Sequence, residues 1–319
     1  MHLVTYRHPR HGATPRVGVV QGDRVLDAAR LIGEDGPLEM LDLLDRGPTA
    51  LTALAAAAEA FAARHREAAA LPETVVAPAW EVELLAPLPR PRSLRDFYAY
   101  EQHVATAYRR RGRAVPPTWY EIPVFYFGHA GTILGPDAPV RQPATTIQLD
   151  FELELACVVG LAGRDIPAER AWEHIAGYTV LNDWSARDVQ RQEMSVGLGP
   201  AKGKDFATSL GPYLVTPDEL ADRFQHGRHD LAMIARINGE EVGRGNAKTL
   251  HWTFAQMIER ASREVELLPG EVIGSGTVGG GCLLELGEEV HPWLQPGDEV
   301  ELEIERLGRL RNRVVGHAE

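Results

Sequence analysis

The chain has 319 residues, of which 44% are hydrophobic and 24% are charged, a composition typical of a globular protein with a full core. Its 33 Lys and Arg against 45 Asp and Glu give a formal net charge of −12, which argues against binding to a nucleic-acid backbone. No apolar run approaches the roughly 18 residues of a membrane span, and the N-terminus has no apolar signal-peptide core. We therefore expect one large domain or two, with neither nucleic acid nor membrane among the partners.

The two cysteines, Cys157 and Cys282, each lie between apolar or glycine residues. Neither belongs to a C-x-x-C pair, which argues against a cysteine zinc site. The sequence predicts two buried free thiols, which fit the reducing environment of the cytoplasm.

The first part of the chain predicts a small N-terminal domain. Short apolar stretches broken by glycine and polar pairs indicate strands at 3–7, 16–21 and 23–29. The Ala-rich range 38–70 has helical composition. Four prolines between residues 78 and 91 interrupt regular structure and indicate a linker. We place the boundary near residue 80, so that residues 1–80 form the small domain and 81–319 the larger one.

The larger domain is expected to be mostly strands and turns. Ranges 97–112 and 248–262 predict helices, and 168–194 predicts two helices around a strand at 178–182. The C-terminal range 283–315 is typical of successive strands joined by PGD and LG turns.

The segment LDFELELACVVG at 149–160 alternates acids with large apolar residues. It predicts one strand with Asp150, Glu152 and Glu154 on one face, and two interpretations compete for that face. The face could lie in water, or Glu152 and Glu154 could bind a hard divalent cation, which prefers oxygen ligands. Asp183, where an apolar strand ends and a helix is expected to begin, favours the cation, although Asp is also an ordinary helix N-cap.

Several common motifs are excluded. GSGTVG at 274–279 matches G-x-G-x-x-G, but a strand-like sequence rather than a helix follows it, so we expect turns beside a site rather than a dinucleotide fold. The sequence has no phosphate-binding P-loop, no G-x-S-x-G and no H-E-x-x-H. The basic run RRRGR at 109–113 is either a solvated face or a local anion site.

Seven segments, in order over roughly residues 90–310, resemble the fumarylacetoacetate hydrolase family. They read RDFYAYEQHVATA, PVFYFGHAGTI, LDFELELACVVG, GYTVLNDWSARDVQ, GKDF, GSGTVGGGCLLELG and LQPGDEVELEIERLG. The resemblance implies a β-rich α+β fold, in which a rolled mixed β-sheet forms the catalytic domain behind a small N-terminal α+β domain. It also implies a homodimer, and a divalent cation (Mg²⁺, Mn²⁺ or Ca²⁺) that chelates oxygens of the substrate.

The resemblance also implies roles for individual residues. The implied metal ligands are Glu152, Glu154, Asp183 and Asp96, which precedes His103 by seven residues as in true fumarylacetoacetases. The implied catalytic residues are His103 with its partner Glu285, and Lys204 in GKDF. The residues implied in substrate binding are Tyr98, Arg111, Tyr126, Arg187, Gln190 and Thr277, although neighbouring arginines could take the place of Arg111. Without the resemblance, the alternatives are surface acids, helix-surface residues, turn residues and packed aromatic rings.

The implied chemistry is metal-dependent cleavage of a C–C bond in a 2,4-dioxo acid, such as an acylpyruvate or a fumarylpyruvate-like compound. A water activated by His103 would attack one carbonyl, and the cation would stabilise the negative charge on the oxygens. Met194 replaces a family tyrosine, which leaves the substrate open. Decarboxylation or tautomerisation of a 2-oxo acid, dehydration of a 2-keto-3-deoxy sugar acid, and a non-catalytic scaffold remain as alternatives.

Overall fold

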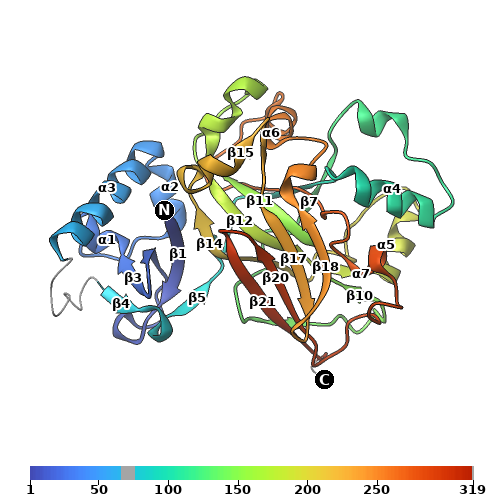
Figure 1. Ribbon diagram of the computed structural model, residues 1–319, viewed down its shortest axis with the longest axis horizontal. Coiled ribbons are helices and arrows are strands. Elements are labelled where there is room, and N and C mark those ends of the chain that lie inside the picture. The colour runs from blue at the N-terminus through green and yellow to red at the C-terminus, as the bar shows by residue number, and fades with distance from the viewer. Residues whose placement is uncertain (66–75, 318–319) are drawn as a thin grey trace.

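The computed structural model describes residues 1–65 and 76–317. A twelve-stranded sheet has the order β4-β3-β2-β1-β14-β12-β11-β19-β6-β7, with β5 paired to β1 and β8 to β14. A five-stranded sheet, β18-β17-β20-β21-β9, lies beside it (Figure 1). Two small ribbons, β10-β13 and β15-β16, complete the sheets of the described chain.

The strands and helices have the following bounds. The twelve-stranded sheet contains β1 (His2–Arg7), β2 (Arg16–Gln21), β3 (Arg24–Asp27), β4 (Val76–Pro78), β5 (Glu83–Leu85), β6 (Leu94–Phe97), β7 (Phe125–Gly128), β8 (Ile133–Leu134), β11 (Leu153–Val159), β12 (Ile175–Asp183), β14 (Thr208–Val215) and β19 (Val272–Gly274). The other strands are β9 (Pro139–Arg141), β10 (Leu149–Asp150), β13 (Ser185–Ala186), β15 (Phe224–Gln225), β16 (Arg228–His229), β17 (Ala232–Ile237), β18 (Glu240–Asn246), β20 (Glu299–Ile304) and β21 (Gly308–Val315). The α-helices are α1 (Ala28–Leu31), α2 (Met40–Asp45), α3 (Pro48–Arg64), α4 (Glu101–Arg110), α5 (Arg187–Met194), α6 (Phe254–Ser262) and α7 (Leu283–Leu286), and the 3-10 helices are η1 (Pro9–His11), η2 (Ala79–Glu81), η3 (Pro117–Tyr120), η4 (Ala168–His174), η5 (Pro217–Arg223) and η6 (Ala247–Thr249).

The N-terminal segment contains the expected strands β1, β2 and β3, followed by the helices α2 and α3. The expected helical range 38–70 continues past residue 65 and lies in part outside the described residues. Strand β1 pairs with β14, where Leu3 lies opposite Leu214, so the N-terminal segment shares a sheet with the rest of the chain. The domain boundary near residue 80 therefore stays a prediction.

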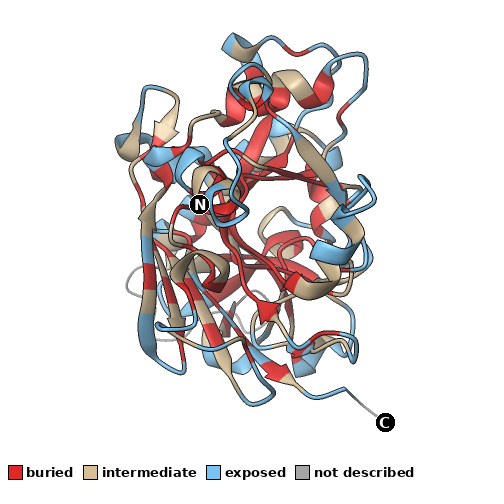
Figure 2. Ribbon diagram, turned by 90° about the vertical axis from the view of Figure 1, so that its right-hand side faces the viewer, coloured by how far each residue is buried: buried red, intermediate tan, exposed pale blue. Residues whose placement is uncertain are grey.

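The middle of the large sheet is buried on both faces (Figure 2). Every residue of β11 and β12 is buried, because elements pack against both faces of these two strands. The interpretation of residues 149–160 as a strand with one face in water is therefore wrong: Glu152 is 5% exposed and Glu154 is 0% exposed.

The expected single strand at 149–160 is also interrupted. Strand β10 ends at Asp150, and β11 begins at Leu153. Side chains replace the sheet ladder between them, because the Phe151 N–H donates to the Asp150 carboxylate and the Glu152 N–H donates to Asn182 Oδ1. Asp150 therefore does not share one continuous strand face with the two glutamates.

Three other expectations need correction. Residues 168–174 form the 3-10 helix η4 rather than an α-helix. Ser185–Ala186 is a short strand, so the helix after Asp183 begins only at Arg187. Residues 283–286 form the short helix α7 instead of a strand, because the Asp150 carboxylate accepts hydrogen bonds from the Leu283 and Leu284 N–H groups.

Two other expectations concern the cysteines and membrane spans. Cys157 and Cys282 are free and buried, as predicted. Across residues 1–65 and 76–317, no helix is both long enough and apolar enough to cross a membrane.

Candidate active site

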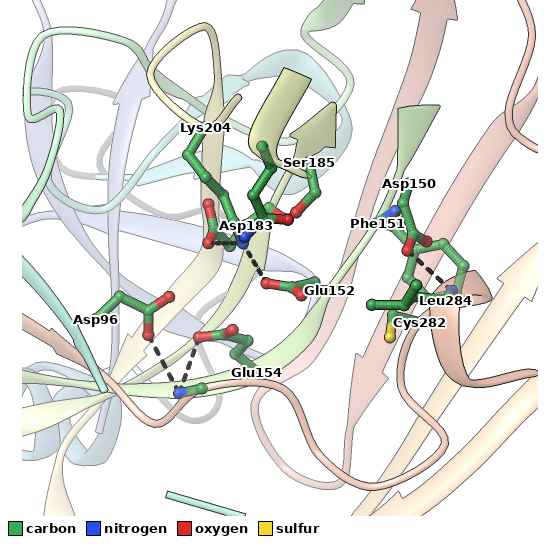
Figure 3. A network of polar contacts seen from close by, with 12 residues as sticks. Asp96, Asp150, Phe151, Glu152, Glu154, Asp183, Ser185, Lys204, Cys282 and Leu284 are labelled. Atoms are coloured by element: carbon green, nitrogen blue, oxygen red, sulfur yellow. Dashed lines mark hydrogen bonds and ion pairs between the residues drawn. The ribbon is translucent and has the colours of Figure 1, made fainter. Parts of the chain in front are cut away.

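Three carboxylates from three strands of the large sheet converge near its centre. Asp96 lies on β6, Glu154 on β11 and Asp183 at the end of β12. Strand β19 pairs with β6 on one side and β11 on the other, while β11 pairs with β12, so the register brings the three side chains together. One oxygen from each carboxylate lies within 4.8 Å of the others, and Figure 3 shows the three side chains pointing toward one another. We call these residues the acid group.

A glycine supports the acid group from the backbone. The Gly276 N–H lies 3.1 Å from Asp96 Oδ1 and 3.1 Å from Glu154 Oε2. Gly276 has a φ of +76°, and a Cβ there would lie 2.4 Å from the Phe97 carbonyl oxygen. Only glycine combines this conformation with this close approach. The sequence did not identify Gly276 as a site residue, although GSGTVG predicted turns beside a site.

The acid group fits a hard divalent cation. Burial, and after it the neighbouring carboxylates, raise the pKa of both Asp96 and Glu154 well above the usual value. Glu154 Oε1 and Asp183 Oδ1 are buried, and neither has a hydrogen-bond partner in the described structure. Unpaired buried carboxylate oxygens are costly, and a cation with oxygen ligands would satisfy them and relieve the repulsion.

The fourth implied ligand, Glu152, contacts two cations of the protein. Its carboxylate forms ion pairs with Lys204 and with Arg187, whose Nη2 lies 2.7 Å from Glu152 Oε1. Burial alone would raise the pKa of Glu152, but these two cations outweigh burial and hold the pKa well below its usual value. Glu152 lies next to the acid group, and its ligand role stays a prediction.

Lys204 joins the fourth glutamate to the acid group. Its ammonium contacts both Glu152 and Asp183, which Figure 3 shows as a bridge between the two carboxylates. Burial would lower the pKa of Lys204, but Asp183 and Glu152 raise it above the usual value and keep the side chain charged. Lys202, two residues earlier, is 76% exposed and pairs only with Asp205 among the described residues.

His103 and Glu285 form a pair on two separate helices, α4 and α7. His103 Nδ1 lies 2.5 Å from Glu285 Oε1, and the side chains are 5% and 4% exposed. The Gly280 N–H donates to the other carboxylate oxygen at 3.2 Å, and the ring of Tyr98 meets His103 edge-on at 5.3 Å. The alternatives of a surface histidine and a surface acid are therefore wrong.

Most of the implied site residues line one cavity of about 260 Å³. The implied site residues that line it are Asp96, Tyr98, His103, Arg111, Tyr126, Glu152, Glu154, Arg187, Gln190, Lys204 and Thr277. Asp183 and Glu285 do not line the cavity but contact residues that do. Tyr126 donates a hydrogen bond to Asp183 Oδ2 at 2.6 Å, and Glu285 forms a hydrogen bond with His103. The structure thus gathers residues from segments far apart in the sequence.

The cavity has a cationic part and an apolar part. Arg187 is buried, and its Nη1 donates a hydrogen bond to Gln190 Oε1 at 3.2 Å. The two residues implied in substrate binding therefore contact each other directly. Apart from Met194, the sequence did not identify the residues that form the apolar part of the cavity wall. Its residues include Val124, Phe125, Met194, Pro200 and Leu284.

Comparisons with known proteins concern the sequence and the fold of the whole chain. A sequence profile described as Fumarylacetoacetate (FAA) hydrolase C-terminal matches residues 92–315. The mitochondrial oxaloacetate tautomerase FAHD2A of Homo sapiens is 34% identical over 320 residues, covering 99% of this chain and 92% of the human protein.

Two solved structures resemble the whole chain. The fumarylacetoacetate hydrolase of psychrophilic Exiguobacterium antarcticum is similar with a TM-score of 0.73 and 26% identity, covering 99% of this chain and 100% of that one. The maleylpyruvate hydrolase of Sphingobium sp. SYK-6, in complex with manganese(II) ion and pyruvate, has a TM-score of 0.72 at 24% identity and covers 100% of both chains. The expected β-rich α+β fold is thereby confirmed.

Proposed function

Because the chain belongs to the fumarylacetoacetate hydrolase family, we propose that it is a divalent-metal-dependent hydrolase that cleaves a C–C bond in a β-diketo acid. Substrates of this class include acylpyruvates, fumarylpyruvate and fumarylacetoacetate-like compounds. The observation that carries the proposal is the buried His103–Glu285 pair, because His103 lines the same cavity as Asp96, Glu154 and Lys204. A hydrolase needs a base for water, and this pair supplies one.

The pairing with Glu285 defines what His103 can do. A carboxylate accepts a hydrogen bond, so in the neutral imidazole Nδ1 carries the proton and Nε2 has the free lone pair. Nε2 can then take a proton from a water that attacks the C4 carbonyl of a 2,4-dioxo acid. The C3–C4 bond breaks, its electron pair becomes the enolate of a 2-oxo acid, and protonation of C3 gives a carboxylic acid and a 2-oxo acid.

The cationic side chains of the cavity suit an anionic substrate. Lys204 is buried and charged, so its ammonium can stabilise the negative charge that develops on the attacked carbonyl oxygen. Arg111 lines the same cavity and can bind a substrate carboxylate. The acid group, with Glu152 beside it, would hold Mg²⁺, Mn²⁺ or Ca²⁺, which as a Lewis acid would supply charge stabilisation to the oxygens of a chelating dioxo acid.

A second candidate function is tautomerisation of a 2-oxo acid such as oxaloacetate. The observation in its favour is the oxaloacetate tautomerase that is 34% identical over almost the whole chain. Tautomerisation moves a proton between carbon and oxygen and breaks no C–C bond, so His103 would act on carbon rather than on water. Decarboxylation and sugar-acid dehydration remain alternatives of the same kind, and the homodimer and the cytoplasmic location also stay predictions.

A panel of 2-oxo and 2,4-dioxo acids tests the proposal. Each compound is incubated with the protein and Mg²⁺, Mn²⁺ or Ca²⁺, with a parallel sample in EDTA, and products are identified by mass. Cleavage of a 2,4-dioxo acid into two acids, abolished by EDTA, supports the hydrolase. Tautomers have the same mass, so the absorbance of the oxaloacetate enol is followed in parallel. Faster loss of this absorbance than without protein, together with no cleavage of any dioxo acid, would replace the hydrolase with the tautomerase.

A further inference from the structure

Asp150 is a completely buried carboxylate that lies outside the acid group. It is 0% exposed, and Figure 3 shows it beside Leu284 and Cys282, away from Asp96 and Glu154. It is the acid of the 149–160 segment for which the family resemblance implies no ligand role.

Both oxygens of Asp150 are used. Oδ1 accepts from the Leu283 N–H at 2.8 Å and from the Phe151 N–H at 2.8 Å. Oδ2 accepts from the Leu284 N–H at 3.0 Å and from Arg187 Nε at 2.8 Å. One carboxylate therefore connects three separate parts of the chain, namely its own strand β10, the helix α5 and the helix α7.

The first connection determines where Glu285 lies. Helix α7 has four residues, and its N-cap residue Cys282 makes no side-chain capping bond. A helix of one turn is not stable by itself, because its first N–H groups need partners. Asp150 supplies two of these partners, at the two residues directly before Glu285.

The second connection determines where Arg187 lies. The bond from Nε to Asp150 fixes the guanidinium so that Nη2 reaches Glu152 and Nη1 reaches Gln190. Arg187 and Gln190 both line the cavity. The Asp150 carboxylate thus helps to place Glu285, the partner of His103. It also helps to place Arg187, which lines the cavity.

We propose that Asp150 is a positioning residue, which acts on the reaction through Glu285 and Arg187 without touching the substrate. The proposal rests on the proposed function, because it takes His103 as the general base and Glu285 as the residue that orients it. A purely structural role would predict that a substitution changes stability and leaves the turnover of the folded protein unchanged.

The test uses Asp150→Asn, which keeps the size of the side chain and removes the charge. The amide NH2 cannot accept from Leu284 or from Arg187. We expect kcat to fall by about 10–100-fold, as for other groups that orient catalytic residues. The metal-induced rise in melting temperature persists, because the acid group is unchanged.

Asp27→Asn is the matched control. Asp27 is also a buried aspartate that pairs with an arginine, Arg16, and that accepts from the N–H of Arg30 in a four-residue helix, α1. It lines none of the cavity described above. We expect this variant to lose stability while its kcat stays within twofold of the wild type.

A double-mutant cycle separates positioning from a general loss of structure. If Asp150 acts through Glu285, then Asp150→Asn lowers kcat much less in a Glu285→Gln background than in the wild type. Equal losses in the two backgrounds, or a folded Asp150→Asn with wild-type kcat, would overturn the proposal. If Asp150→Asn does not fold, Asp150→Glu is measured instead: a melting curve like that of the wild type with lowered kcat supports the proposal, and an unchanged kcat overturns it.

A spectroscopic measurement keeps this inference separate from the proposed function. In protein with nitrogen-labelled histidine, the NMR signal of the His103 ring reports its bond to Glu285. We expect Asp150→Asn to shift this signal and Asp27→Asn to leave it in place. If the wild type cleaves no dioxo acid but the His103 signal responds in this way, the proposed reaction fails and the positioning role stands. If the His103 signal does not respond, the positioning role fails whatever the reaction.

Discussion

His103 Nδ1 lies 2.5 Å from Glu285 Oε1, although the two residues are 182 positions apart in the sequence. Both side chains are buried, so the hydrogen bond is shielded from water and fixes the orientation of the imidazole ring. The ring faces a cavity that is also lined by Asp96, Glu154 and Lys204. The candidate base His103 and two residues of the candidate cation site thus line the same cavity.

The first prediction concerns this pair. In His103→Ala, C–C cleavage should fall by about 10²–10⁴-fold, because the group that takes the proton from water is lost. Steady-state kinetics with an acylpyruvate measures the effect. His174→Ala is the control, since His174 is also buried but belongs to η4, away from the cavity. Full activity in His103→Ala would exclude the role in water activation.

The second prediction compares two lysines that are two positions apart. Lys204→Met leaves Glu152 and Asp183 without their shared ammonium, and breaking a buried pair of this kind costs about 3–5 kcal/mol of unfolding free energy. Lys202→Met removes only a surface ion pair, and we expect its stability to be close to that of the wild type. Urea unfolding in EDTA measures both variants. Equal stabilities would contradict the neutralising role of Lys204.

Much of the fold could be predicted because the signals are local. Strands β1, β2 and β3 follow from short apolar runs between turn residues, and β20 and β21 from the LG turn between them. The grouping of His103, Lys204 and Asp183 followed from the family resemblance rather than from periodicity.

Two of the wrong expectations share a physical cause, which is a long-range polar contact. Helix α7 looked like a strand because its cap comes from Asp150, 133 positions before Leu283. The break between β10 and β11 depends on Asn182, a side chain on another strand. No window of the sequence contains both partners of such a bond, so local pattern cannot reveal it.

The third prediction concerns the glycine beneath the acid group. In Gly276→Ala, the new Cβ would lie 2.4 Å from the Phe97 oxygen at a φ of +76°. Backbone strain alone costs about 1–2 kcal/mol, and the clash moves the N–H that holds Asp96 and Glu154. We expect loss of both stability and the melting-temperature response to metal.

Gly22→Ala is the matched control for this substitution. Gly22 has a φ of +60°, but no atom lies within 4 Å of a Cβ placed there. It should show the strain without the clash, and its response to metal should be that of the wild type. A wild-type response in Gly276→Ala would contradict the role of this backbone.

The fourth prediction concerns pH. Burial and the neighbouring carboxylates raise the pKa of Asp96 and Glu154 in the folded protein. Without metal, the folded state therefore holds these protons more tightly than the unfolded state, and stability is lost as pH rises from the usual carboxyl pKa through the raised values. Glu152, whose pKa is lowered, acts in the opposite direction: its contribution to stability is complete above the usual carboxyl pKa and is lost as pH falls below it.

A divalent cation must displace the same protons, so its affinity should increase across the same pH range. Melting curves with and without Mn²⁺ at a series of pH values measure this, and the metal-induced shift should grow as pH rises. In Glu154→Gln the protein without metal should melt higher, and its metal response should be smaller. A metal shift that is independent of pH would show that these carboxyls are not the ligands.

Product identity tests the central claim most directly. The protein is incubated with an acylpyruvate and Mg²⁺ or Mn²⁺, and all products are quantified by mass spectrometry. The proposed hydrolase predicts pyruvate and a carboxylic acid in equal amounts, with formation lost in EDTA and in His103→Ala. Recovery of the dioxo acid with its carbon skeleton intact, in the presence of metal and folded protein, would contradict it.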